Sequence, residues 1–240
     1  MNIDDFKKIM CSYAKKIDIM FDDKQLKQFY EYMNLLLEWN KKINLTAITE
    51  PEEVVLKHFI DSLTISKYIE ENTTLADVGT GAGFPGIPLK IYRPDLKITL
   101  VDSLNKRINF LNEVICLLDL KDISTVHSRI EDFGKNNQYR EKFDYVTARA
   151  VANVSVLSEY LIPLSKVEGK CIYMKGSEIE EELNNGKNAI NILGGKIEKV
   201  EEFKLPDSDI LRNIIIINKM KNTPSKYPRK AGMPVKEPLK

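Results

Sequence analysis

The stretch Asp77-Val-Gly-Thr-Gly-Ala-Gly-Phe-Pro-Gly86 decides the fold. It follows a short apolar run at 75–78 and leads into a helical pattern at 86–92. Glycines at these positions let the backbone turn tightly and approach a ligand that a Cβ atom would obstruct. The helix would then present unpaired N–H groups and a positive dipole to a carboxylate or phosphate. The order of strand, glycine turn and helix therefore predicts a cofactor at the carboxyl end of a parallel sheet.

Two acidic residues help to identify that cofactor. Asp102 follows the next predicted strand, where a carboxylate can accept hydrogen bonds from both ribose hydroxyls of an adenosine. Residues 81–86 also satisfy the dinucleotide pattern GxGxxG, so NAD stays open as an alternative. Asp77 precedes the first glycine by two residues, and its charge would repel a pyrophosphate but attract an ammonium group. S-adenosylmethionine carries an ammonium group, and the sequence favours it over NAD and over a glycine turn without ligand.

Beyond residue 74 the chain alternates short apolar runs with helical patterns. This alternation predicts an α/β fold whose mostly parallel sheet is covered by helices on both faces. A short Pro-Asp-Ser loop joins the last two strands, which predicts a hairpin. The expected strands are 75–78, 98–101, 123–127, 145–148, 171–174, 196–203 and 213–218, and the expected helices are 86–92, 104–118, 153–162 and 177–192.

The N-terminal part of the chain is predicted to be helical. Apolar residues recur at helical spacing within 3–17 and again within 26–37, and Pro51 suits the first turn of a third helix. We expect a helical extension at 1–50 packed on a main domain at 51–220, followed by a basic, Pro-rich tail at 221–240.

Composition excludes several classes of protein. The 240 residues are 43% hydrophobic and 30% charged, as in soluble globular proteins. The sequence lacks an apolar run long enough to span a bilayer and the pattern of a signal peptide, so we expect a cytoplasmic protein. Cys11, Cys116 and Cys171 lie far apart, and only two histidines are present, which predicts core packing of the cysteines and no metal site. We expect a monomer, because the helices leave no long apolar stripe unpartnered.

Further candidate residues follow other predicted strands, at the edge where open parallel sheets bind their ligands. The backbone of Ile130 and the carboxylate of Glu131 could meet the adenine edge of the cofactor. Arg149 lies just past the fourth strand, and Lys175 ends the fifth. Taken singly, each charge fits a solvated side chain, but the shared edge supports a common site.

His58, Asp61 and Ser62 lie on one face of a predicted helix. A hydrolase triad brings such groups together from distant segments, around a nucleophile and an oxyanion hole that the sequence does not reveal. We interpret the three residues as capping groups or as a polar patch that faces substrate.

The tail concentrates positive charge. It holds six basic side chains against one acid, a net charge of +5, which leaves −4 on the other 220 residues. Tyr227 stands among cations that include Arg229 and Lys230, a pattern that suits phosphate attraction and base stacking. A flexible solubilising tail explains the composition equally well.

Taken together, the motifs resemble those of the bacterial ribosomal RNA small-subunit methyltransferase G family, also called glucose-inhibited division protein B. The resemblance covers nearly the whole chain, and its most specific parts are the extension GFPGIPL and the ending YPRKAG. The matching stretches are 44–48 (NLTAI), 58–63 (HFIDSL), 77–89 (DVGTGAGFPGIPL), 102–107 (DSLNKR), 144–150 (DYVTARA), 175–176 (KG) and 227–232 (YPRKAG).

The resemblance implies a class I S-adenosylmethionine-dependent methyltransferase with a Rossmann-like sheet, acting on N7 of one guanine in 16S rRNA, as naked RNA or within the 30S subunit. By similarity, Gly79, Gly81 and Phe84 would flank the cofactor, with Ile130 and Glu131 at its adenine end. Asp102 keeps the ribose role. Arg149 would reach the methionine side or the incoming base, and Arg149 or Lys175 would orient the guanine. Lys175, Arg229 and Lys230 would contact RNA.

That reaction suits a site without an evident catalytic acid or base. Guanine N7 is an exposed lone-pair acceptor that carries no proton, so its methylation needs no general base. Two other functions remain open at this point. A small-molecule methyltransferase would share the sheet and the glycine turn, and a non-catalytic RNA-binding module would bind RNA without gaining anything from the cofactor.

Overall fold

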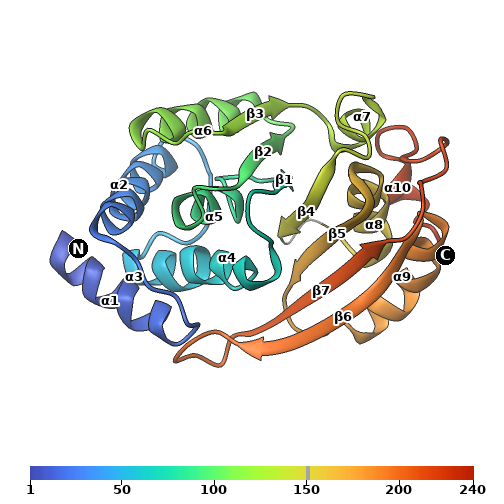
Figure 1. The fold of residues 1–240 in the computed structure, drawn as a ribbon. Coiled ribbons are helices and arrows are strands. Elements are labelled where there is room, and N and C mark those ends of the chain that lie inside the picture. Colours follow the sequence, from blue (N-terminus) through green and yellow to red (C-terminus); the bar gives the residue numbers. More distant parts are fainter. Residues whose placement is uncertain (150–151) are drawn as a thin grey trace.

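A seven-stranded sheet runs through the centre of the computed structural model, which describes residues 1–149 and 152–240 (Figure 1). The strand order is β3-β2-β1-β4-β5-β7-β6. The first five strands pair in parallel, and β7 runs antiparallel to both β5 and β6, which confirms the predicted hairpin. The strands are β1 (Thr74–Val78), β2 (Lys97–Asp102), β3 (Ile123–His127), β4 (Phe143–Arg149), β5 (Ser165–Lys175), β6 (Gly195–Lys204) and β7 (Leu211–Lys219).

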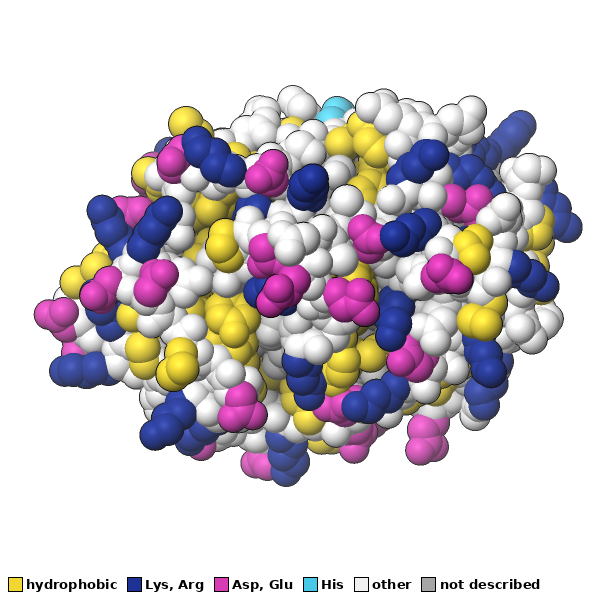
Figure 2. All heavy atoms as spheres, viewed as in Figure 1, with side chains coloured by type: hydrophobic (Ala, Val, Ile, Leu, Met, Phe, Trp, Pro, Cys, Tyr) yellow, Lys and Arg dark blue, Asp and Glu magenta, His cyan; other side chains and the backbone are white. Residues whose placement is uncertain are grey.

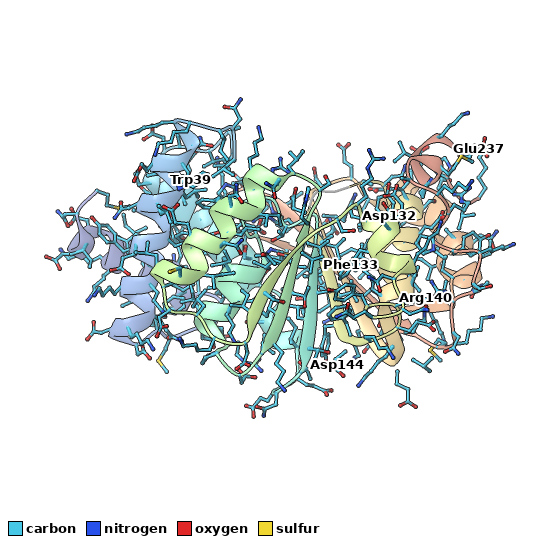
Figure 3. All side chains as sticks on the ribbon, turned by 90° about the horizontal axis from the view of Figure 1, so that it is seen from above. Trp39, Asp132, Phe133, Arg140, Asp144 and Glu237 are labelled. Atoms are coloured by element: carbon cyan, nitrogen blue, oxygen red, sulfur yellow. The ribbon has the colours of Figure 1, made fainter. Side chains whose placement is uncertain are left out.

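Helices cover both faces of the sheet, as predicted. On one face lie α5 (Gly86–Tyr92) and α6 (Asn105–Leu117), and on the other lie α8 (Val154–Leu161) and α9 (Glu180–Ile192) (Figures 1 and 3). Each face has its own apolar core, which explains why the residues of β1 are almost all buried. A short helix that the sequence pattern did not predict, α7 (Ile130–Lys135), follows β3.

The N-terminal helices share a core with the sheet. α1 (Ile3–Lys15) and α2 (Asp23–Asn40) place their apolar stripes in the cluster that also contains residues of β1, β2 and α5. Asp22 and Gln25 form a capping box that fixes the start of α2. A continuous helical segment then begins at Pro51, as predicted, and comprises α3 (Pro51–Val54), a π-helical turn (Val55–Ile60) and α4 (Asp61–Leu63).

The tail folds back onto the main domain and ends near α10 (Met233–Lys236). Tyr227 is only 7% exposed and belongs to the core cluster of α7 and α8, which contradicts both interpretations of this residue, a ring that stacks on bases and a part of a flexible tail. Its apolar ring gains more from this core than from water. Two short 3₁₀ segments, Ser66–Tyr68 and Ile162–Leu164, complete the fold.

The cysteines differ from expectation. Cys171 is buried, but Cys11 and Cys116 are exposed. The prediction of core packing is therefore wrong for Cys11 and Cys116, because they lie off the apolar stripes of α1 and α6. Within residues 1–149 and 152–240, every helix is too short or too polar to cross a membrane, and His, Cys, Asp and Glu side chains form no group of three that could hold a metal.

Candidate active site

A hollow of about 460 Å³ lies where β1, β2 and β4 end. The sheet order reverses between β1 and β4, which is where open α/β sheets bind their ligands. The hollow therefore combines the glycine turn, the ends of three strands and the helical segment that starts at Pro51. Its lining consists of Leu45, Thr46, His58, Gly79, Thr80, Gly81, Ala82, Phe84, Asp102, Ser103, Arg107, Ile130 and Arg149.

The glycine turn presents its backbone to this hollow. Gly81 has φ +63°, and a Cβ atom there would find nothing within 4 Å. The open side of Gly81 thus faces space that a ligand can occupy. Gly86 has a different role, since its Cβ would lie 2.3 Å from Leu100 Cδ2 and 2.9 Å from Asp77 Oδ2. Glycine at 86 lets α5 approach the sheet, and glycine at 81 leaves the hollow open.

Asp102 holds the turn from the end of β2. Its Oδ2 accepts from the Gly81 N–H at 3.0 Å and from Arg107 Nη1 at 3.2 Å, and its Oδ1 accepts from the Leu104 N–H at 2.9 Å. The residue is 2% exposed, and it borders the hollow. A carboxylate offers about four lone-pair positions. Three of them are used, so Oδ1 of Asp102 has room to accept from one ribose hydroxyl, and a second hydroxyl would have to displace Arg107 Nη1 from Oδ2.

Asp77 lies buried beneath the turn with one oxygen unpartnered. Its Oδ2 accepts from the Thr80 hydroxyl at 2.6 Å and from the Gly86 N–H at 2.8 Å. The start of α5 is therefore capped internally, and the prediction that its first N–H groups are free for a ligand is wrong for Gly86. Asp77 Oδ1 has no hydrogen-bond partner among the described residues. Burial raises the pKa of the Asp77 carboxyl to about 6.

Arg149 joins β4 to the helical segment at 51–63. Its guanidinium lies 4.8 Å from the centre of the Phe84 ring. Nη2 is 3.1 Å from His58 Nδ1, and Nη1 is 3.3 Å from Asp61 Oδ2. Asp61 is buried and also pairs with Arg212 Nε at 3.0 Å. These contacts fix the direction of a cation that borders the hollow.

His58 is a neutral member of the same cluster. Its ring stacks on Phe84 with centroids 4.4 Å apart, and its Nε2 is 2.8 Å from the Thr46 hydroxyl. Burial and the charge of Arg149 lower the pKa of His58 to about 3. Ser62 donates to the His58 carbonyl, so this hydroxyl is not aligned as a nucleophile. The prediction of a polar patch beside substrate fits this geometry better than a hydrolase triad.

The structure separates the predicted residues into two groups. Gly79, Gly81, Phe84, Asp102, Ile130 and Arg149 all border the hollow. Lys175, Glu131, Arg229 and Lys230 are not among the residues that line it. Lys175 pairs with Glu182 at 2.7 Å, Arg229 pairs with Glu159 at 2.6 Å, and Glu131 accepts from the Gly232 N–H at 2.9 Å.

Six lining residues were not predicted from the residues alone, namely Leu45, Thr46, Thr80, Ala82, Ser103 and Arg107. Thr46 and Arg107 stand in stretches that carry the resemblance, 44–48 and 102–107, and their place in those motifs was the signal. Ser103 lies directly after Asp102 in the second stretch. Ala150, the last residue of the stretch 144–150, lies outside the residues that the structure describes.

The sheet order, with β7 antiparallel between β5 and β6, is that of the class I fold of S-adenosylmethionine-dependent methyltransferases. The fold is similar to that of a SAM-dependent methyltransferase from Aquifex aeolicus, with a TM-score of 0.52 and 20% identity over 75% of this chain and 97% of that one. It is also similar to M. jannaschii TYW2 in complex with AdoMet, with a TM-score of 0.52 and 16% identity over 65% of this chain and 72% of that one.

Sequence similarity then identifies the family. The model of rRNA small subunit methyltransferase G matches residues 25–211, and the chain belongs to this family. A ribosomal RNA small subunit methyltransferase G from Acetivibrio thermocellus is 56% identical, with 97% of this chain and 96% of the relative aligned. The protein of the same name from Alkaliphilus metalliredigens is 52% identical over 98% of this chain and 99% of its own length.

Proposed function

We propose that this chain transfers a methyl group from S-adenosylmethionine to N7 of one guanine in 16S rRNA. The observation that carries the proposal is the end-to-end similarity to proteins named ribosomal RNA small subunit methyltransferase G. The hollow supports it, because the turn, the acid of β2 and a fixed cation border one space. A small-molecule methyltransferase would share the sheet and the turn, but similarity of this length favours the rRNA substrate.

The residues around the hollow fit the cofactor chemically. We assign Gly79, Gly81 and Phe84 to flank it and Asp102 to accept from its ribose. Ile130 would meet its adenine. Asp77 is fully buried beneath the glycine turn and does not line the hollow, and we assign its unpartnered oxygen to attract the ammonium group of a cofactor seated on that turn. When bound, the cofactor supplies an electrophilic methyl group on a sulfonium sulfur.

The acceptor side needs alignment more than proton transfer. As the N7–carbon bond forms, the carbon–sulfur bond breaks, and the positive charge passes from sulfur to the guanine. N7 has no proton to lose, and Arg149 is a donor only. His58 already has Arg149 and Thr46 at its two ring nitrogens, so it is not available as a base. We assign Arg149 to orient the guanine, in a reaction where alignment can contribute about 7 to 11 kcal/mol.

Contact with rRNA is expected to be local rather than spread over a uniform basic face. On the face shown in Figure 2, Lys and Arg side chains are intermixed with Asp and Glu. Lys230 is exposed and stays a predicted phosphate contact, whereas Lys175 and Arg229 already have carboxylate partners. A monomer acting in the cytoplasm also stays a prediction.

The reaction can be tested with S-adenosylmethionine labelled in its methyl group. We expect label to enter 30S subunits or 16S rRNA that lack the modification, and nuclease digestion to release it as 7-methylguanosine. The Gly81→Val variant serves as the background control. Label in another nucleoside would contradict N7 specificity, and no label in either RNA would contradict the rRNA substrate. Removing residues 221–240 is not a suitable control, because the tail is packed into the fold.

The affinity for S-adenosylmethionine should depend on pH through Asp77. The carboxyl of the free protein has a pKa of about 6, and an ammonium ligand favours the ionised form. Binding therefore requires loss of a proton below pH 6, and the dissociation constant should rise about tenfold for each unit below that pH. Between pH 6 and about pH 8, where an α-amino group begins to lose its own proton, the affinity should be constant.

Asp77→Asn is the matched substitution, since the amide oxygen that it introduces can still accept from Thr80 and Gly86. Asp77→Asn should weaken binding at pH 7.5 by roughly 10- to 100-fold, the range of a charge-assisted hydrogen bond, and should remove the slope below pH 6. Isothermal titration calorimetry in buffers of different ionisation enthalpy measures both the affinity and the proton released. An unchanged slope in Asp77→Asn would assign the titration to another group.

A further inference from the structure

The C-terminal segment 223–236, here called the strap, is fastened to α7 at both ends of this helix. At the start of α7, Glu131 Oε1 accepts from the Gly232 N–H at 2.9 Å. Near the end of α7, Gly134 packs closely on Pro228. A Cβ atom added to Gly134 would lie 2.9 Å from Pro228 Cγ. In Figure 3, Asp132 of α7 lies on the same side of the sheet as Glu237 of the C-terminal segment.

Arg140 adds a bridge just beyond α7. Its Nη1 donates to the carbonyl of Gly134 at 3.2 Å and to that of Tyr227 at 2.7 Å, and its Nη2 donates to that of Thr223 at 2.8 Å. One guanidinium thus links the last turn of α7 to two points of the strap. Several donors on a planar cation hold such an arrangement in a defined geometry.

A second anchor fixes the strap to α8. Arg229 donates to both carboxylate oxygens of Glu159, from Nε at 2.9 Å and from Nη2 at 2.6 Å, and its backbone N–H donates to the same carboxylate at 2.7 Å. Glu159 is fully buried, so this pair holds firmly. Four of the six residues in the ending YPRKAG, namely Tyr227, Pro228, Arg229 and Gly232, therefore have internal contacts, and Lys230 and Ala231 are exposed.

α7 needs this support. It has six residues and no side-chain cap at its N-terminus. A helix of this length does not persist in water on its own, so its position depends on the elements that pack on it. Its first residue, Ile130, borders the hollow. Any shift of α7 therefore moves one wall of that hollow.

We propose that the strap is a positioning element of the cofactor site: it holds α7 so that Ile130 stays in the wall of the hollow. Glu131 and Gly232 are the positioning residues, since they act through Ile130. The inference rests on the proposed function only in taking the hollow as the site of S-adenosylmethionine. The strap would thereby serve cofactor binding in addition to the phosphate contact predicted for Lys230.

The test is a pair of substitutions at Glu131 in the full chain. Glu131→Ala removes the acceptor for Gly232, and Glu131→Gln keeps an oxygen that can accept. We expect Glu131→Ala to raise the dissociation constant for S-adenosylmethionine roughly tenfold, the scale of one lost charge-assisted hydrogen bond, and Glu131→Gln to restore most of it. The KM for the cofactor should rise while kcat at saturating cofactor stays near the wild-type value, a split that general loss of stability would not produce.

Gly134→Ala provides an independent second variant, because its added methyl group displaces Pro228 from α7. It should weaken cofactor binding in the same direction. Lys236→Ala is the control, since it removes an exposed charge of the strap at a residue to which no binding role is assigned. It should leave cofactor binding unchanged. Hydrogen exchange at residues 129–135 and 226–233 reports whether the strap has loosened in each variant.

Two results would overturn the proposal. In the first, exchange becomes faster in Glu131→Ala or Gly134→Ala while cofactor affinity stays within twofold of the wild type. In the second, exchange and affinity both stay unchanged in the two variants, which would show that these contacts do not hold α7. Failure of the wild-type protein to bind S-adenosylmethionine would instead contradict the proposed function.

Discussion

Replacing Gly81 with valine should lower kcat/KM for S-adenosylmethionine by about a hundredfold or more, the penalty known for small misplacements of a reacting group. A Cβ atom at Gly81 meets no protein atom within 4 Å, because its direction leads into the hollow. The two methyl groups of valine would fill space assigned to the cofactor. The dissociation constant of Gly81→Val for S-adenosylmethionine, measured by calorimetry, should rise as well.

The backbone at Gly81 calls for a matched control. Its φ of +63° strains any β-branched residue, at a cost of about 1–2 kcal/mol in folding free energy. Asn72 has φ +58° and is exposed far from the hollow, so Asn72→Val carries the same strain without blocking a site. It should lower the melting temperature in a similar way and leave cofactor affinity unchanged. Wild-type affinity in Gly81→Val would place the cofactor elsewhere.

The fold could be predicted where the chain has clear periodicity. The helix at 86–92 and the strand at 123–127 have the predicted bounds. β5 starts at Ser165, six residues before the predicted 171, because Lys166, Val167 and Glu168 are exposed at its first half and do not form an apolar run. α7 was missed because six residues with a glycine at 134 carry no helical pattern.

The candidate site was predictable where function sets a local pattern, and less so where it depends on distant partners. The glycine turn and Asp102 stand in a fixed order along the chain, and both border the hollow. The partners of Arg229 and Glu131 lie 70 and 101 residues away, at Glu159 and Gly232, and local spacing does not reveal them. One signal was present. Glu159 is the single acid in the otherwise uncharged helix 154–161, which suggests a buried partner.

Charge alone misled the interpretation of the tail. A net charge of +5 suggests a polyanion, but it does not distinguish cations that face solvent from those that pair inside the protein. Arg229 pairs with Glu159, and Tyr227 lies in the core. Lys226 and Lys230 are exposed. The ending YPRKAG is thus specific because most of its residues have a structural partner.

The second large effect is expected on stability, at Arg229. Arg229→Met keeps most of the apolar stem but leaves the buried carboxylate of Glu159 without its cation. Breaking a buried pair in this way costs about 3–5 kcal/mol. Urea denaturation should therefore show a lower midpoint at an unchanged slope, whereas Lys230→Met, at the adjacent exposed position, should change the free energy of unfolding by less than about 0.5 kcal/mol.

A double substitution separates the loss of the pair from the cost of an unpaired charge. Glu159→Gln removes that charge and keeps an oxygen that can accept from the backbone N–H of Arg229. Glu159→Gln with Arg229→Met should therefore be more stable than Arg229→Met alone by about 2 kcal/mol, because the uncompensated charge accounts for about half of the destabilisation. If Arg229→Met and the double variant were equally stable, the charge on Glu159 would be hydrated in Arg229→Met. Arg229 would then contribute through packing of the strap.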